Sequence, residues 1–157
     1  MLNPLYCGAT LVILDSFAPK ETIDTIRSEK LSVLYVVPSI CSLLTKLASK
    51  EDMASVRLII LGGTTLPLKI AEDFMAKFGL SITEGYGLSE ASPVVTLNPP
   101  GKEKIGSIGL PLQGIKARII DTEGHEVPTG EAGELIIQAD TVMQGYWHLP
   151  EATAEAL

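Results

Sequence analysis

The run from Glu84 to Glu90 (EGYGLSE) contains two glycines, an aromatic ring, a hydroxyl and a carboxylate. Glycine lets a backbone turn sharply or approach a ligand closely, because it tolerates positive φ and has no Cβ. Tyr86 offers a flat face to a planar ring, and Ser89 can donate a hydrogen bond to a phosphate oxygen. Glu90 is an acceptor-only anion suited to a hard cation such as Mg²⁺. Together these residues indicate a nucleotide and metal site.

The same run also has a plainer interpretation. A Gly-Tyr-Gly sequence often marks an ordinary strand-to-loop turn, and Ser92-Pro93 can initiate a turn. Glu90 could form a surface ion pair with Lys102 or Lys104 instead of holding a metal. Because short motifs carry a high false-positive risk, the choice depends on the neighbouring segments.

Both neighbouring segments favour the nucleotide site. Upstream, the apolar run Val56–Leu61 ends in Gly62-Gly63-Thr64, and a helical pattern follows from Leu68 to Phe78. A buried strand, a glycine turn and a helix form a common nucleotide-facing unit of open α/β sheets, where ligands lie beyond the carboxyl ends of the strands. Downstream, three further blocks follow: Gly130–Leu135 (GEAGEL), Met143–Trp147 (MQGYW) and Pro150–Thr153 (PEAT).

The order and spacing of these blocks resemble the adenylate-forming (AMP-binding) superfamily, which includes acyl-CoA synthetases, adenylation domains of peptide synthetases and luciferases. The chain looks closest to the long-chain fatty acyl-CoA synthetases, through Tyr86–Val95 (YGLSEASPVV) and Ile105–Pro111 (IGSIGLP). The resemblance covers essentially the whole chain. It implies that a fatty acid attacks the α-phosphate of ATP to give acyl-AMP and pyrophosphate, and that coenzyme A then takes the acyl group.

The resemblance also implies roles for individual residues. Tyr86 would stack on the adenine, Ser89 would contact the α-phosphate, and Glu90 would hold Mg²⁺, which makes Ser89 and Glu90 the candidate catalytic residues. The expected nucleotide-binding residues are Gly62, Gly63, Thr64, Gly85, Tyr86, Gly87 and Ser89. The expected pocket for the acid is formed by Val37, Pro38, Gly87 and Leu88. Taken alone, Val37 and Pro38 are each better explained as a plain core strand and the start of a helix.

A length of 157 residues corresponds to only part of such an enzyme. Complete members of the superfamily run to several hundred residues. The phosphate loop with its lysine, the ribose-binding aspartate and the catalytic lysine of the C-terminal domain have no counterpart in this sequence. We therefore expect an interior fragment of the large N-terminal domain, or a truncated reading frame, that is inactive as an isolated chain.

Two other functions stay open. The chain could be a non-catalytic fragment that binds adenine nucleotides weakly, or that self-associates through exposed apolar faces and strand edges. It could also come from an acyl-AMP ligase or from the adenylation domain of a peptide synthetase, with a carrier protein in place of coenzyme A.

Composition argues against several other classes of protein. The 46% hydrophobic content fits a compact interior rather than disorder, and no apolar run reaches the ~20 residues that span a bilayer. The net charge of −7 comes entirely from residues 81–157, which hold four Lys/Arg against eleven Asp/Glu. Such an acidic surface argues against a nucleic-acid partner. Cys7 and Cys41 both lie in apolar company, which predicts reduced core thiols in a cytoplasmic protein.

The first hundred residues alternate strand and helix patterns. Helices are expected at 19–29, from Pro38 to Leu47, and at 68–78, the last closed by Gly79. Strands are expected at 10–14, 33–37, 56–61 and 81–84. Alternating strands and helices predict an α/β fold with a mostly parallel sheet, covered on both faces.

The pattern changes near residue 100, after the breaker cluster Asn98–Gly101 (NPPG). Strands are expected at 115–120 and 134–138 without intervening helices, and Asp121–Gly124 is expected to form a hairpin turn. We therefore predict an α/β subdomain over residues 1–100 and a small β-barrel or meander over residues 101–157.

Overall fold

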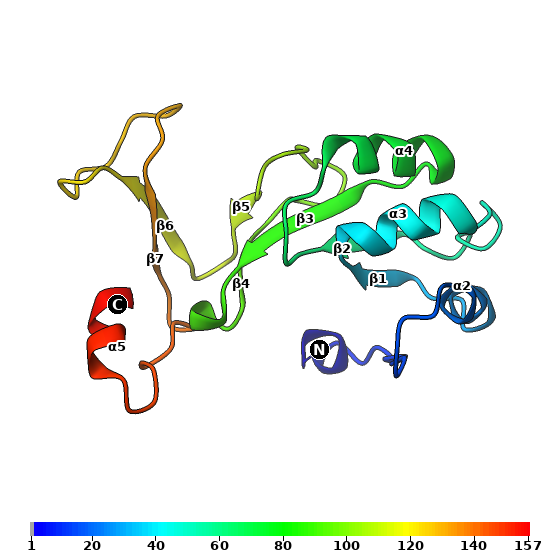
Figure 1. Cartoon of the computed structure of the whole chain (residues 1–157), viewed down its shortest axis with the longest axis horizontal. Helices are drawn as coiled ribbons and strands as arrows, with labels where there is room; N and C mark the ends of the chain where they lie inside the picture. The colour runs from blue at the N-terminus through cyan, green and yellow to red at the C-terminus, as the bar shows by residue number, and fades with distance from the viewer. Residues whose placement is uncertain (1) are drawn as a thin grey trace.

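The computed structural model describes residues 2–157, which form a mixed α/β fold (Figure 1). The helices are α1 (Leu2–Tyr6), α2 (Pro19–Ser28), α3 (Pro38–Leu47), α4 (Leu68–Phe78), the short 3₁₀ helix η1 (Ser89–Ala91) and α5 (Pro150–Ala156). The strands are β1 (Val33–Val36), β2 (Leu58–Leu61), β3 (Ile82–Gly87), β4 (Val94–Leu97), β5 (Leu110–Pro111), β6 (Lys116–Ile120) and β7 (Glu134–Gln138).

One five-stranded sheet, in the order β1-β2-β3-β4-β5, organises the first two thirds of the chain. β1, β2 and β3 run parallel, with Val36 opposite Leu61 and Leu61 opposite Glu84. β4 and β5 then add antiparallel pairs on the far side of β3. The predicted α/β fold with flanking helices is confirmed, and β4 and β5 extend the sheet in a way that the sequence did not predict.

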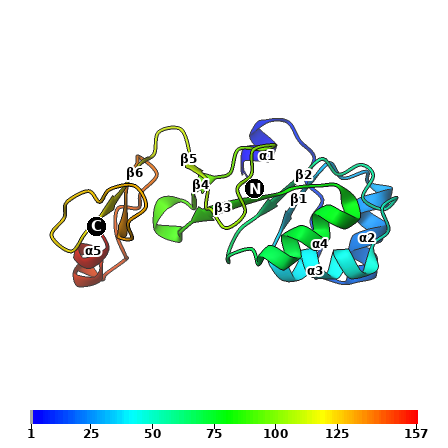
Figure 2. The same cartoon turned by 90° about the horizontal axis from the view of Figure 1, so that it is seen from above.

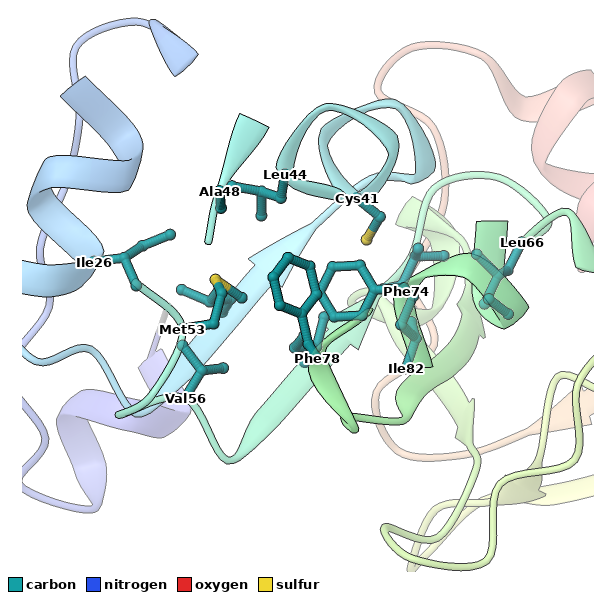
Figure 3. Close-up of a cluster of buried hydrophobic side chains, with 14 residues drawn as sticks. Ile26, Cys41, Leu44, Ala48, Met53, Val56, Leu66, Phe74, Phe78 and Ile82 are labelled. Atoms are coloured by element: carbon teal, nitrogen blue, oxygen red, sulfur yellow. The ribbon is translucent and has the colours of Figure 1, made fainter. Parts of the chain in front are cut away.

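Helices α2, α3 and α4 cover one face of this sheet (Figure 2). Each has only 10 or 11 residues, which is too short for a helix to be stable in water without tertiary packing. The packing comes from one apolar cluster, in which side chains of these three helices meet those of the strands (Figure 3). Phe74 is fully buried, with its ring centroid 4.7 Å from that of Phe78, and burying one such ring contributes about 1.5–3 kcal/mol.

The opposite face of the sheet is largely open, contrary to the expectation that both faces are covered. Tyr35 of β1 is 59% exposed there. A cavity of about 1030 Å³ lies between this face and the N-terminal segment of residues 3–17. The strand predicted at Thr10–Leu14 is wrong: these residues form no regular structure, and Ile13 is 72% exposed. An apolar run becomes a strand only where a neighbour can take up its backbone hydrogen bonds, and this run pairs with no strand of residues 2–157.

β3 changes partner halfway along its length. Its first half pairs with β2, and Gly85, Tyr86 and Gly87 pair with β4 across a bulge. A Cβ at Gly87 would lie 1.7 Å from the carbonyl oxygen of Pro93, so only glycine fits. Gly85 and Gly87 both lack positive φ, which means that close approach of two backbones, rather than a left-handed turn, requires them.

The end of the chain forms a separate small unit without a core of its own. β6 and β7 make a two-stranded antiparallel sheet, so the described residues contain no closed barrel. No residue from 99 to 157 is fully buried. β5 belongs to the first sheet although it lies beyond residue 100, and the division at that residue stays a prediction. Helix α5 was not predicted, although Pro150 in its first turn is a common start signal.

The two cysteines differ in their surroundings. Cys41 is buried as expected, and burial raises the pKa of its thiol to about 11. Cys7 is exposed, so its prediction as a core thiol is wrong, because helix α1 lies apart from the apolar cluster.

Within residues 2–157, no helix combines the length and the apolar character needed to cross a membrane.

The close contact at Gly87 predicts that an alanine destabilises the fold more at this position than at Gly62. Gly87→Ala should lower the free energy of unfolding by ~3 kcal/mol or more, because the backbones of β3 and β4 must separate to admit a Cβ. Gly62→Ala is the matched control, since nothing lies within 4 Å of its added Cβ and its φ is not positive. It should change the unfolding free energy by less than ~1 kcal/mol. Equal effects of the two variants in urea denaturation would contradict the steric explanation.

Candidate functional site

Three of the predicted groups lie together at the carboxyl edge of the parallel strands. The register sets Val36, Leu61 and Glu84 side by side, so the residues that follow each of them start from the same edge, where β1 and β2 end and β3 continues. These residues are Val37-Pro38, Gly62-Gly63-Thr64 and Gly85-Tyr86. A Cβ built on Gly63 would lie 3.9 Å from Val37 Cγ1, so the proposed acid pocket and nucleotide loop lie next to each other. Ligands of open α/β sheets bind at this edge.

Glu84 holds the loop between β2 and α4 (residues 62–67, called the glycine loop below) against β3. Its side chain is only 6% exposed, and its Oε1 accepts a hydrogen bond of 2.9 Å from the Leu66 backbone N–H. Its Oε2 is buried without a hydrogen-bond partner among residues 2–157. A buried carboxylate oxygen that lacks a donor is costly, which makes Glu84 a candidate contact for a donor group of a ligand.

Asn98 fastens the other side of β3. It is 2% exposed, and its side-chain amide donates to the backbone oxygens of Glu84 and Ser107 at 3.0 and 2.6 Å. Its Oδ1 accepts from the backbone N–H of Lys104 at 3.1 Å. The sequence identified Asn98 only as part of a breaker cluster, whereas its side chain holds the loop after β4 against the strand that carries Tyr86.

Beyond Glu84, the run becomes accessible. Tyr86 is 38% exposed, Ser89 is exposed and Leu88 is half-buried. Of the two acid-pocket residues on the other loop, Val37 is 41% exposed and Pro38 is buried in the first turn of α3. No hydrogen bond of the described residues joins Ser89 directly to the glycine loop. β3 links these two parts of the predicted site, because its Glu84 accepts from Leu66 and its last residue precedes Ser89 by two positions.

Glu90 is held from the far end of the chain. The phenol of Tyr146 donates a hydrogen bond of 2.5 Å to Glu90 Oε1, and the backbone N–H of Met143 donates to the Glu90 carbonyl at 2.7 Å. The phenol hydrogen bond lowers the pKa of the Glu90 carboxyl below its ordinary value of 4.5. The same bond raises the pKa of Tyr146 above 10.0. Glu90 forms no ion pair within residues 2–157, so the alternative pairing with Lys102 or Lys104 is not observed.

Glu90 fits a magnesium ion as a single carboxylate ligand. Its carboxylate is ionised at neutral pH, and the phenol bond occupies one of its two oxygens. Among the described residues, no three His, Cys, Asp or Glu side chains form a metal-binding group. Mg²⁺ suits such a place, because it is commonly bound by one or two carboxylates together with water and substrate phosphates.

The comparison with protein families decides the assignment. Residues 1–147 match the family described as AMP-binding enzyme. The chain belongs to this family. The resemblance based on the blocks around Tyr86 and Gly145 is thereby confirmed.

Curated members of the AMP-binding family cover nearly all of this chain. A feruloyl-CoA synthase of Amycolatopsis is 32% identical over 99% of the chain, and a long-chain-fatty-acid–CoA ligase of Bacillus subtilis is 36% identical over 96%. The chain spans only 32% and 28% of their respective lengths, so it corresponds to about a third of such a protein.

Solved structures of the family show the same fold. The anthranilate CoA ligase AuaEII, solved with anthranoyl-AMP, superimposes with a TM-score of 0.89 at 29% identity. MatB of Rhodopseudomonas palustris, solved with ATP bound, gives the same TM-score and identity. In both comparisons 97% of this chain matches 30% of the other chain.

Sequence reasoning missed three residues that organise this candidate site. Glu84 was noted at the head of the run but given no role, and its place at the end of a buried strand was the available signal. Tyr146 lies within the block Met143–Trp147, yet nothing local connects it with Glu90, which is 56 positions away. Asn98 carried no signal beyond its type.

The Glu84 contact can be tested by removing its acceptor. Glu84→Ala should lower the free energy of unfolding by about 1–3 kcal/mol, because the Leu66 N–H would stay buried without a partner. Glu84→Gln keeps an acceptor for Leu66, so it should cost clearly less. Denaturant midpoints of both variants provide the measurement. A larger loss in the glutamine variant would show that the anchor to Leu66 is unimportant.

The Glu90–Tyr146 contact predicts a defined pH dependence. Because the folded pKa of Glu90 is depressed, the contribution of the pair to stability is present above pH 4.5 and is lost as pH falls through the lowered value. Because the folded pKa of Tyr146 is raised, the contribution is present below pH 10.0 and is lost as pH rises through the raised value. The difference in unfolding free energy between wild type and Tyr146→Phe should therefore be largest between these limits. Carbon NMR titration should find a higher Glu90 pKa in the variant, and identical titrations would contradict the contact.

Proposed function

We propose that this chain forms the adenine- and metal-facing part of an ATP-dependent carboxylate–CoA ligase that acts on a fatty acid. The observation that carries the proposal is the register of β1, β2 and β3, which gathers Val37, the glycine loop and Tyr86 at one edge of the sheet. Membership of the AMP-binding family and the match to a structure with bound ATP support the nucleotide.

The nucleotide would lie between the glycine loop and Tyr86. Gly62, Gly63 and Thr64 follow directly after β2 and would border the adenine, with the exposed ring of Tyr86 stacked on it. Ser89, which is exposed, would donate to the α-phosphate. Charge builds on this phosphate as the carboxylate attacks, so a directed donor stabilises the transition state more than the ground state.

Glu90 would hold Mg²⁺ beside the phosphates. Its carboxylate is the ionised group at the end of the accessible run, and η1 fixes its backbone. An ion bound there would neutralise phosphate charge during adenylation. Glu90 itself would supply the carboxylate that attracts the ion, and the orientation of this carboxylate would set where the ion lies.

The acid substrate would enter beside Val37 and Leu88, next to Gly87. A fatty acid is favoured because the long-chain-fatty-acid–CoA ligases are among the more similar curated relatives, at 36% identity for that of Bacillus subtilis. The feruloyl-CoA synthases and the anthranilate CoA ligase make aromatic acids the competing substrate class. Coenzyme A is the proposed acceptor, since all of these names specify CoA.

A second candidate function is self-association of the chain. It is favoured by the open sheet face around Tyr35 and by the absence of any fully buried residue from 99 to 157. Apolar surface and strand edges left uncovered favour contacts between copies.

One set of measurements separates these functions. We expect AMP and Mg·ATP, but not GTP, to raise the melting temperature, since a ligand that binds only the folded state stabilises it by RT ln(1 + [L]/Kd). Glu90→Gln should reduce the effect of Mg·ATP and leave that of AMP unchanged. ATP–pyrophosphate exchange with fatty, ferulic and anthranilic acids should stay at the blank, because the chain holds only about a third of the relatives' length.

The outcomes that contradict the proposal are distinct. Exchange above the blank would refute the predicted inactivity, and the acid that supports it would identify the substrate class. Absence of any nucleotide effect, together with a sedimentation coefficient that rises with concentration, would favour self-association over nucleotide binding.

A further inference from the structure

Tyr146 contacts the one carboxylate that the proposed function assigns to the metal. It lies in the loop between β7 and α5, whereas Glu90 lies in η1 next to the central sheet. Its phenol donates to Glu90 Oε1, and no hydrogen bond to the other oxygen, Oε2, is found among the described residues. The phenol therefore fixes one oxygen of the carboxylate and leaves the second available to a ligand.

The loop that carries Tyr146 is itself held in place. The Tyr146 backbone N–H donates to Thr153 Oγ1 at 2.9 Å, and Thr153 Oγ1 donates to the Leu149 carbonyl at 2.9 Å. A Cβ at Gly145 would lie 2.7 Å from Thr153 Cγ2, so the glycine lets the loop pack directly on α5. The phenol is thus presented to Glu90 by a packed turn, not by a freely moving side chain.

The Tyr146 phenol is not needed merely to attach its loop to η1. The Met143 N–H already joins the same loop to the Glu90 carbonyl, through backbone atoms alone. The phenol adds control over the carboxylate, whose free rotation would otherwise be lost when a metal binds. Carboxylates that ligate metals are in general held by a further hydrogen bond, which orients them.

We propose that Tyr146 is a positioning residue, which orients the Glu90 carboxylate so that its free oxygen faces a divalent cation bound with the nucleotide. This role rests on the proposed function, because it requires Glu90 to be a metal ligand. It makes the loop of residues 143–147 part of the site, although these residues lie outside the sheet that carries the rest.

The test compares Mg²⁺-dependent nucleotide binding by calorimetry, in the 157-residue chain, at rising free Mg²⁺. Tyr146→Phe should weaken the affinity gained from Mg²⁺ by about three- to tenfold, the usual worth of one hydrogen bond. Affinity for ATP without Mg²⁺ should stay at the wild-type value. In a Glu90→Gln background, Tyr146→Phe should have no further effect on Mg²⁺ dependence. Thr153→Val, which frees the loop from α5, is a second variant that should act in the same direction.

Tyr6→Phe is the matched control, because it removes the same hydroxyl from a tyrosine that is 93% exposed and whose phenol forms no hydrogen bond with any of residues 2–157. It should behave as wild type. Wild-type Mg²⁺ dependence in both Tyr146→Phe and Thr153→Val, with loss in Glu90→Gln, would overturn the role of Tyr146 and leave the proposed function intact. Nucleotide binding by wild type that ignores Mg²⁺, or no binding, would overturn the metal role of Glu90 and that of Tyr146 with it.

Discussion

The close approach of β3 and β4 at Gly87 is the constraint on which the rest of the structure depends. A side chain there would collide with the Pro93 carbonyl, so the two backbones meet only because Gly87 has none. This contact lets β3 extend beyond the end of its parallel partner β2, paired with the antiparallel strand β4. As a result, Tyr86 and Ser89 extend past the carboxyl edge of the parallel strands instead of ending there. The geometry of the candidate site follows from this one exchange of partners.

Two buried polar side chains stabilise the strand at the same point. Glu84 binds the glycine loop on one side of β3, and Asn98 binds the loop after β4 on the other. Buried polar groups are expensive unless they are hydrogen-bonded, so each restricts its surroundings to the arrangement that satisfies it. Asn98 is satisfied on both its donor and acceptor atoms, whereas Glu84 keeps one oxygen without a partner in the described residues. The hydrogen bonds of Asn98 and Glu84 thus hold the segments around β3 in place, while Glu84 Oε2 has no donor among the described residues.

Residues 99–157 obey a different constraint, because none of them is fully buried. A two-stranded sheet is at best marginally stable by itself in water. In this chain β6, β7 and α5 are joined to the central sheet near Glu90, where Met143 and Tyr146 donate to it. The position of the candidate metal ligand and the placement of the small unit are therefore linked through the same few atoms.

The sequence by itself determined the elements whose signals are local. The helices α2, α3 and α4, the strands β1 and β2, and the end of α4 at Gly79 all follow from neighbouring residues, and each was predicted. The family and the run from Glu84 to Glu90 were also identified from sequence. Only the tertiary structure decided whether an apolar run had a partner, which is why Thr10–Leu14 forms no strand although Val94–Leu97 does. It likewise decided that Glu90 meets Tyr146 and that Glu84 meets Leu66. Hydrogen bonds between residues distant in sequence depend on how the elements pack, and the spacing of residues along the chain does not determine that packing.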